Sequence, residues 1–158
     1  MDTGYTWLYK WADTIKLSEA YATLEERLQS IHADKFAAWE VEVSLFHHKL
    51  LNSSELPKEI ASELFTYKDQ DSQFSYVYSP NSKVPYIIQT DDQVKIFVDK
   101  TGSYDLRRTL FTKGWQWRFQ DIIFKIGTLS IGVEPKCLLV MIQYLPCIHY
   151  SVDMDRVK

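Results

Sequence analysis

Two carboxylates, Glu40 and Glu42, are the residues best spaced for chemistry in this chain. They lie two positions apart in a segment where apolar and polar residues alternate, so both point to one face of a predicted strand. If that face lined a barrel, the two carboxylates would supply the oxygen ligands that Mg²⁺ or Mn²⁺ prefers. A metal held there could assist the hydrolysis of a triphosphate.

This pair resembles the Glu-x-Glu-x-Lys strand of the triphosphate tunnel metalloenzymes, but the match is incomplete. The lysine expected two residues after Glu42 is Ser44. The tunnel also needs rows of Glu, Lys and Arg on other strands, and residues 122–131 and 137–144 contribute only Lys125 and Gln143. A metal site that lacks most of its ligands does not bind metal usefully. A strand whose polar face meets water is the simpler interpretation, and the hydrolase is kept as the alternative.

The other reactive residue types lack the spacing that chemistry requires. His47 and His48 are adjacent in a predicted strand, so their rings point to opposite faces and cannot hold one metal ion together. The sequence contains no glycine-rich phosphate loop and no serine in a nucleophile elbow. Cys137 and Cys147 lie in apolar surroundings and are expected to act as small buried side chains. We therefore predict no catalytic residue, no metal site and no cofactor.

The composition is that of a globular chain rich in aromatic residues. Its 158 residues suffice for one domain with a sizeable core, and they include 5 Trp, 10 Tyr and 8 Phe. The net charge of −3 argues against a nucleic-acid-binding surface. No apolar run approaches the about 18 residues of a membrane-spanning helix, and residues 1–11 lack the pattern of a signal peptide. We expect no direct nucleic acid partner and no membrane.

Two segments carry the helical spacing of apolar residues. The first, residues 19–32, follows Ser18 as a candidate N-cap, and its apolar stripe consists of Tyr21, Leu24, Leu28 and Ile31. The second follows residues 90–93, whose Thr and Gln match a capping box, and it ends near Gly102. Residues 94–98 also alternate, so a strand is the competing interpretation there. The first helix is expected to lay its stripe on a sheet.

The predicted strands are apolar segments with a period of two, separated by polar or glycine-containing turns. In one of them Trp39, Val41, Val43 and Leu45 form an apolar face that is expected to be buried, opposite a polar face that meets water, a lined cavity or a partner. The others are residues 6–11, 64–68, 74–78, 86–89, 106–111, 115–119, 122–131 and 137–144.

Residues 115–147 show the alternation most clearly. The apolar phase shifts by one residue at Gly127, which suggests a β-bulge that bends the strand. Residues 137–144 are apolar on both faces apart from Gln143, as in a central strand. With the two helices, these segments predict an α+β fold: an antiparallel, strongly curved sheet that forms a partial β-barrel with two or more packed helices.

The same region resembles a known family. The stretches FQDIIFKIGTLSIG, residues 119–132, and CLLVMIQYLPC, residues 137–147, resemble the core motifs of Mediator subunit 20. Leu145 departs from the glycine that the family has in its last motif. Upstream, a helix ending near Ile31 and a strand ending in Phe46-His47 follow in the family's order. The resemblance therefore covers nearly the whole chain.

The resemblance implies both a fold and a function. It implies a single barrel-like domain over residues 1–158 that pairs directly with Mediator subunit 18, and through it joins Mediator subunit 8 and the rest of the head module. This module works beside RNA polymerase II and TATA-binding protein, so the implied role is transcription regulation in the nucleus. The family has no catalytic residues. It usually continues with a C-terminal helix, which we expect to be absent or to lie beyond Lys158.

Four residues are our candidates for the partner interface: Trp115, Trp117, Arg118 and Phe119. Trp and Arg are the side chains that most often anchor protein interfaces. Packing against the first helix is an equally good use of the two tryptophans. A small-ligand-binding barrel is a third alternative, but it requires a wide lumen, which the bulky Trp and Phe faces argue against.

Overall fold

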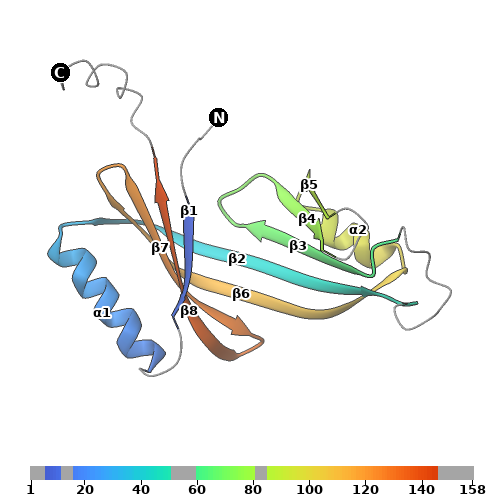
Figure 1. Cartoon of the computed structure of the whole chain (residues 1–158), viewed down its shortest axis with the longest axis horizontal. Coiled ribbons are helices and arrows are strands. Elements are labelled where there is room, and N and C mark those ends of the chain that lie inside the picture. Colours follow the sequence, from blue (N-terminus) through green and yellow to red (C-terminus); the bar gives the residue numbers. More distant parts are fainter. Residues whose placement is uncertain (1–5, 12–15, 51–59, 81–84, 146–158) are drawn as a thin grey trace, which may run out of the picture. The chain divides into compact units, whose positions relative to one another are not determined.

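The structure of the chain is a computed structural model that describes residues 6–11, 16–50, 60–80 and 85–145. These residues form eight strands and two helices (Figure 1). The elements are β1 (Thr6–Trp11), α1 (Leu17–Ser30), β2 (Asp34–His48), β3 (Glu63–Asp69), β4 (Ser75–Ser79), β5 (Tyr86–Thr90), α2 (Val94–Lys100), β6 (Tyr104–Phe119), β7 (Ile122–Ile131) and β8 (Glu134–Tyr144). Neither helix is long and apolar enough to cross a bilayer.

The strands pair in the order β1-β8-β7-β6-β2-β3-β4-β5. The pairs β1–β8, β2–β3, β3–β4 and β4–β5 are antiparallel, and β6–β7–β8 are neighbours joined by two-residue turns, as antiparallel hairpins are. The predicted α+β fold with an antiparallel sheet is thereby confirmed. The order ends at β1 and β5 without pairing them to each other, so the partial barrel stays a prediction.

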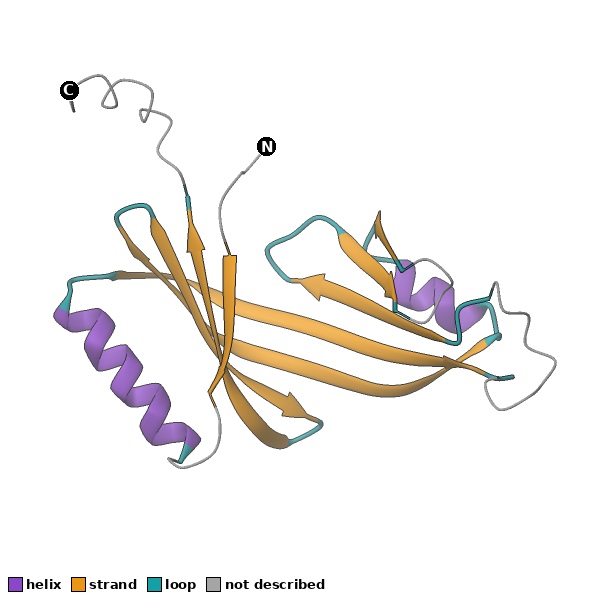
Figure 2. Cartoon of the chain, in the orientation of Figure 1, coloured by secondary structure: helices purple, strands orange, loops and turns teal. Residues whose placement is uncertain are grey.

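The chain divides into two compact units whose boundaries fall inside long strands. Unit 1 comprises Met1–Ala38, Gly114–Thr128 and Cys137–Lys158, and unit 2 comprises Trp39–Lys113 and Leu129–Lys136. Each unit contains one of the two helices beside its strands (Figure 2). Strands β2 and β6 each contribute residues to both units. A single domain over residues 1–158 stays a prediction.

Unit 1 has its core where α1 meets the strands. Ala20 and Leu28 of α1 are buried, with Tyr21 and Leu24 packed beside them. The strands contribute Trp117, Ile126 and Leu138 to the same core, with Phe119, Phe124 and Val140 at its margin. This is the predicted helix stripe on a sheet. Cys137 is also buried, as expected, whereas Cys147 lies outside the described residues.

Two details at the ends of α1 correct the prediction. The helix begins one residue before Ser18, with Lys16 at the N-cap and no side-chain cap bond. It ends at Ser30, and His32 then adopts a positive φ of 58° that turns the chain away. Ile31, predicted as the last residue of the stripe, is therefore 42% exposed. The strand that follows starts at Asp34 rather than at Trp39.

Two glycines mark a close approach of strands in unit 1. A Cβ on Gly114 would lie 1.8 Å from the carbonyl oxygen of Ile126 and 2.4 Å from Cα of Gly127. Only a residue without a side chain fits there. Gly114 also lies within one continuous strand, β6, which the sequence predicted as two separate strands. The bulge at Gly127 stays a prediction, since β7 runs without interruption from Ile122 to Ile131.

Unit 2 has its core between α2 and the sheet. Buried Phe46, Leu64 and Val77 of the strands contact Val98 of α2, with Ala61 nearby. The predicted second helix is therefore confirmed over the competing strand. Its capping box does not form.

At the start of α2, the N-cap Gln93 has no side-chain cap bond, and its N–H donates to Asp91 Oδ1 at 3.0 Å. Gly102 follows the helix with a φ of 67°, as the predicted helix end requires.

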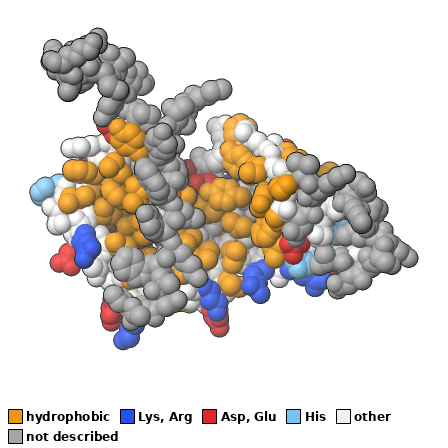
Figure 3. Space-filling model, viewed as in Figure 1, with side chains coloured by type: hydrophobic (Ala, Val, Ile, Leu, Met, Phe, Trp, Pro, Cys, Tyr) orange, Lys and Arg blue, Asp and Glu red, His pale blue; other side chains and the backbone are white. Residues whose placement is uncertain are grey.

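The two faces of β2 are covered differently from what its pattern predicts. Trp39 and Val41 are buried as expected, but Val43 and Leu45 are only half-buried. Ser44, from the predicted polar face, has no exposed surface. This face of β2 also carries Phe46 and is the one covered by α2. In the view of Figure 3, hydrophobic side chains gather over β3 and β4.

Candidate functional site

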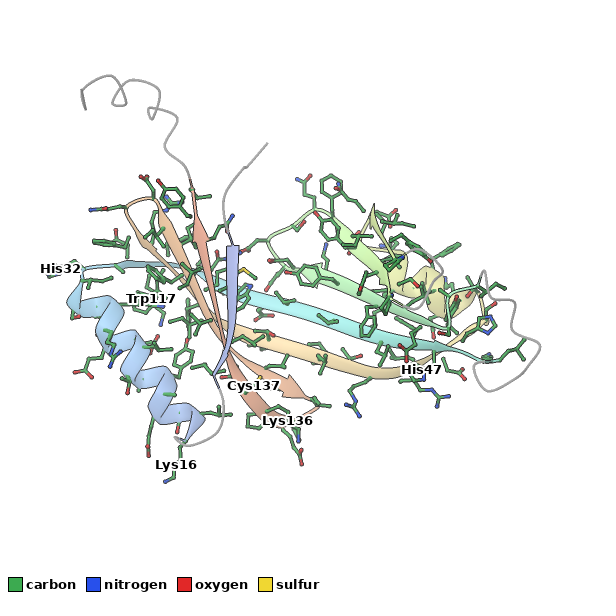
Figure 4. The ribbon with its side chains drawn as sticks, in the orientation of Figure 1. Lys16, His32, His47, Trp117, Lys136 and Cys137 are labelled. Carbon is green, nitrogen blue, oxygen red and sulfur yellow. The ribbon has the colours of Figure 1, made fainter. Side chains whose placement is uncertain are left out.

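The four predicted interface residues lie on two faces of β6 in unit 1. Trp117 is 2% exposed and lies between α1 and the strands (Figure 4), with Phe119 packed against the same core. Trp115 is 42% exposed. Arg118 points the other way and is exposed. Trp117 thus packs against the first helix, which was the alternative use of the tryptophans.

Lys35 ties α1 to the tryptophans of β6. Its Nζ donates to Glu25 Oε1 of α1 at 2.9 Å and lies 4.2 Å from the ring centroid of Trp115 and 5.3 Å from that of Trp117. A cation over an indole face is attracted by the ring quadrupole. Lys35 therefore shields part of Trp115. This role was not predicted, because the strand was expected to begin at Trp39 and Lys35 precedes it.

On the opposite face, the guanidinium of Arg118 lies 5.2 Å from the ring centroid of Phe36, which is 48% exposed. Next to it, buried Gln116 donates from Nε2 to the carbonyl of Ala38 at 2.9 Å. Gln116 therefore has a structural role, whereas Arg118 and Phe36 form an exposed cation–π pair that another protein could contact.

Glu40 and Glu42 share one face of β2, as predicted, and line a cleft of about 480 Å³ in unit 2. The cleft is also lined by Lys68 of β3, Asp92 before α2 and Lys113 of β6. The predicted polar face therefore meets a lined cavity, one of the three possibilities that its pattern left open.

Each carboxylate of this region has a lysine beside it. The pairs are Lys113 Nζ with Glu40 Oε2 at 3.7 Å, Lys68 Nζ with Asp92 Oδ2 at 3.8 Å, and Lys95 Nζ in contact with Glu42 Oε1. The charges balance in pairs. Half-exposed pairs of this kind contribute little to stability, about 0–1 kcal/mol each. They also lower the attraction that the carboxylates would exert on a metal cation.

The lysines lie on β3, α2 and β6. Charged ligands for this site were expected instead on residues 122–131 and 137–144, which contribute only Lys125 and Gln143. Ser44, at the position of the tunnel enzymes' lysine, is buried; its hydroxyl donates to Glu42 at 3.2 Å and lies 3.3 Å from that of Thr109. A signal was present for Lys68, because it falls on the same strand face as buried Leu64 and Thr66.

The histidines of unit 2 are engaged separately. His47 Nε2 lies 3.3 Å from Glu63 Oε1, whereas His48 Nδ1 accepts the N–H of Leu50 at 3.1 Å. The His48 ring also meets that of Tyr104 edge-on, with centroids 5.0 Å apart. Within the described residues, no group of three or more His, Cys, Asp or Glu side chains is arranged to hold a metal ion.

Comparison with solved structures identifies relatives of this fold. The chain is similar to the PH1012 protein from Pyrococcus horikoshii, with 15% identity, 90% of this chain and 79% of that one covered, and a TM-score of 0.50. At this identity the likeness concerns the fold alone.

Two further similarities have lower scores. A chain of the Schizosaccharomyces pombe Mediator head module shares 12% identity over 97% of this chain and 88% of its own, with a TM-score of 0.49. The S. pombe RNA triphosphatase Pct1 shares 10% over 88% and 62%, with a TM-score of 0.40. Both scores are too low to carry an argument about function. Among curated protein sequences, none matches the chain.

The family comparison is the more informative one. The model of a family described as "TATA-binding related factor (TRF) of subunit 20 of Mediator complex" matches residues 3–158. The match includes both units and the stretches 119–132 and 137–147 on which the resemblance was based. Since it extends over nearly all of the 158 residues, the chain belongs to the family of Mediator complex subunit 20.

Proposed function

We propose that this chain is a non-catalytic subunit of the Mediator head module that pairs directly with Mediator subunit 18. The observation that carries the proposal is the family match over residues 3–158. Through subunit 18 the chain joins Mediator subunit 8 and the rest of the module. In this assembly, in the nucleus, it helps couple regulators to initiation by RNA polymerase II and TATA-binding protein. The partial barrel that the family resemblance implies is part of the same proposal.

The chemistry of the cleft supports a non-catalytic role. Glu40 and Glu42, the two residues best spaced for metal binding, are each engaged by a lysine. A metal ion would have to displace Lys95 from Glu42 and would gain few further ligands nearby. The carboxylates therefore pair with lysines of β6 and α2.

Trp115 and Arg118 enter the proposal as candidate contacts with the partner. Both are exposed, on opposite faces of β6, and each already takes part in a cation–π contact that fixes its position. A side chain held in place loses less conformational entropy on binding. Trp117 and Phe119 lie beneath α1 and would support the contact from within.

Co-expression with Mediator subunit 18 tests the pairing. We expect the two chains to elute as one stoichiometric complex in size-exclusion chromatography. Arg118→Glu should weaken the complex if this side of β6 contacts subunit 18, and an unchanged complex would exclude that contact. Two soluble chains that elute separately would refute the pairing.

A second candidate function is the hydrolysis of triphosphates, and the cleft is the observation that favours it. Glu40, Glu42 and the lysines Lys68 and Lys113 line one cavity of about 480 Å³. This candidate predicts Mn²⁺-dependent phosphate release from nucleoside triphosphates, abolished by Glu40→Ala. The paired charges argue against it. No phosphate release at high protein concentration would remove this candidate.

A further inference from the structure

One face of the sheet in unit 2 is apolar and largely open. The strand register places on this face seven side chains that we call the tyrosine face: Val43, Leu45, Phe65, Tyr67, Tyr76, Tyr78 and Ile87. They form two rows across the strands, because residues paired in register lie on the same side of a sheet. Leu45, Phe65, Tyr78 and Ile87 make one row, and Val43, Tyr67 and Tyr76 the other.

The tyrosine face is ordered but incompletely covered. Phe65 and Tyr78 have ring centroids 6.2 Å apart, and so have Tyr67 and Tyr76. Tyr78 is nevertheless 40% exposed and Ile87 70% exposed, and the other five are half-buried. The reverse side of β2, β3 and β4, with Phe46, Leu64 and Val77, is covered by α2 and buried. A contiguous apolar sheet face of this kind is typical of a protein–protein interface.

The charges around the tyrosine face limit what covers it. At the paired positions of β2, β3, β4 and β5, this face carries no lysine and no arginine. It does carry two carboxylates, Glu63 and Asp69, at the two ends of β3, and Nε2 of His47 on the same face lies 3.3 Å from Glu63 Oε1. Asp69 is close enough to Tyr67 to add to the rise of the tyrosine pKa to about 12, which burial mainly causes. The face is thus apolar in the middle and acidic at the Asp69 end, whereas at the other end His47 accompanies Glu63.

We infer that the tyrosine face is the main docking surface of this chain for a partner protein whose contact surface is apolar with a basic rim. Tyrosine is enriched at interfaces because it combines a large apolar ring with a polar hydroxyl. An apolar partner surface matches the middle of the face, and Lys or Arg at its rim matches the acidic end at Asp69. The inference rests on the proposed function, since it names the surface through which the subunit joins its assembly.

A matched pair of substitutions tests the apolar part. Ile87→Asp places a charge at the most exposed position of the tyrosine face, on the edge strand β5, where Ile87 is 70% exposed. Val133→Asp places the same charge in the turn between β7 and β8, where Val133 is 98% exposed. Because both side chains are exposed, both variants should fold, which thermal melts will verify. Binding to Mediator subunit 18, measured by titration, should weaken at least roughly tenfold for Ile87→Asp and stay unchanged for Val133→Asp.

Opposite charges at one position test the basic rim. Gln89 is exposed and pairs with Tyr76 across the strands, beside the tyrosine face. Gln89→Lys should weaken binding several-fold, whereas Gln89→Glu should not weaken it, and the gap between the two should shrink at high salt. Equal effects of the two substitutions on binding would show that the partner's rim is not basic.

The outcomes separate this inference from the function on which it rests. A wild-type chain that does not bind subunit 18 refutes both. A wild-type chain that binds, while Ile87→Asp binds equally well, refutes the docking surface alone. Wild-type self-association that Ile87→Asp abolishes would show that a second copy occupies the face, and would also overturn the inference. Loss of binding in Ile87→Asp with Val133→Asp unaffected supports it.

Discussion

Two aromatic regions of this chain have similar sequence patterns, but one is buried and the other is partly exposed. In unit 1, Trp117 and Phe119 alternate along β6 and are closed off by α1, so Trp117 is 2% exposed. In unit 2, Tyr76 and Tyr78 alternate along β4, and Tyr78 is 40% exposed. The difference is the cover. Helix α1 has 14 residues and lies on the tryptophan side, whereas α2 has 7 and lies on the face opposite the tyrosines.

This comparison shows that an aromatic strand face does not reveal by itself whether it belongs to a core or to an interface. The tryptophans are the larger rings and the stronger interface anchors in general, yet Trp117 is used for packing. The tyrosines, each with a hydroxyl that tolerates water, remain on the open face. Substitutions in the two regions should therefore differ in what they change: stability in unit 1 and binding in unit 2.

The largest expected effect is that of Trp117→Ala in unit 1. Removing a buried tryptophan from the α1 core leaves a cavity, and the free energy of unfolding should fall by about 3–5 kcal/mol. Chemical denaturation measures this. Trp115→Ala serves as the control, because Trp115 is 42% exposed and should cost much less. Equal costs for the two variants would show that α1 does not close off Trp117.

Gly114→Ala should have the next largest effect. The new Cβ would meet the backbone of Ile126 and Gly127, which cannot rotate away. We therefore expect the free energy of unfolding to fall by about 1–3 kcal/mol because of overpacking. Gly102→Ala is the control, since Gly102 has open space around it and a positive φ of 67°, and it isolates the backbone cost. A thermal melt in which Gly114→Ala is no worse than Gly102→Ala would contradict the close approach of the strands.

A smaller effect is expected for Lys35→Ala, which removes the contact between α1 and the half-open Trp115. Its ion pair with Glu25 and its cation–π contacts together should contribute about 1 kcal/mol. The fluorescence of Trp115 should also report greater access of water and of a soluble quencher. Lys16→Ala, which removes a 3.9 Å pair at an exposed site, should leave both measurements unchanged. Unchanged quenching in Lys35→Ala would show that Lys35 does not shield the ring.

Local alternation was sufficient to locate the strands, but not to tell which face of a strand is covered. A period of two can be read from neighbouring residues, so β1, β3, β4, β5, β7 and β8 were predicted at or close to their true positions. The cover of β2 depends instead on distant partners, such as Thr109, which meets Ser44 across 65 positions. Lys95 and Lys113 likewise reach Glu42 and Glu40 only in the folded chain.

For the candidate site, the sequence identified Glu40 and Glu42 as neighbours on one face and Trp117 as a side chain that could serve either a core or a partner. It did not identify the tyrosine face. The signal was present in the predicted strands 64–68 and 74–78, where Phe65 and Tyr67 alternate on the first and Tyr76 and Tyr78 on the second. Its meaning appears only with the register, which shows that all four rings lie on the side away from α2.

The smallest expected effect is a pH dependence that compares one tyrosine from each region. The pKa values of Tyr21, beside α1, and of Tyr67, on the tyrosine face, are both raised to about 12, in each case mainly by burial. Folded tyrosine therefore holds its proton where unfolded tyrosine, near 10.0, has lost it. The resulting stabilisation is complete below pH 10 and is lost as pH rises towards 12. Tyr21→Phe and Tyr67→Phe should each flatten the fall of stability in alkali measured by denaturation.

Binding should then separate the two tyrosines. A partner on the tyrosine face removes water from Tyr67 but not from Tyr21, and loss of water disfavours the charged phenolate. Absorbance titration of the complex should show fewer tyrosines ionising in the alkaline range than the two free chains together. In the Tyr67→Phe variant this difference should shrink, because Tyr76 and Tyr78 remain on the covered face, and in the Tyr21→Phe variant it should stay unchanged. The reverse result would place the partner against unit 1, on the α1 side, and would reassign the interface to the region of Trp115.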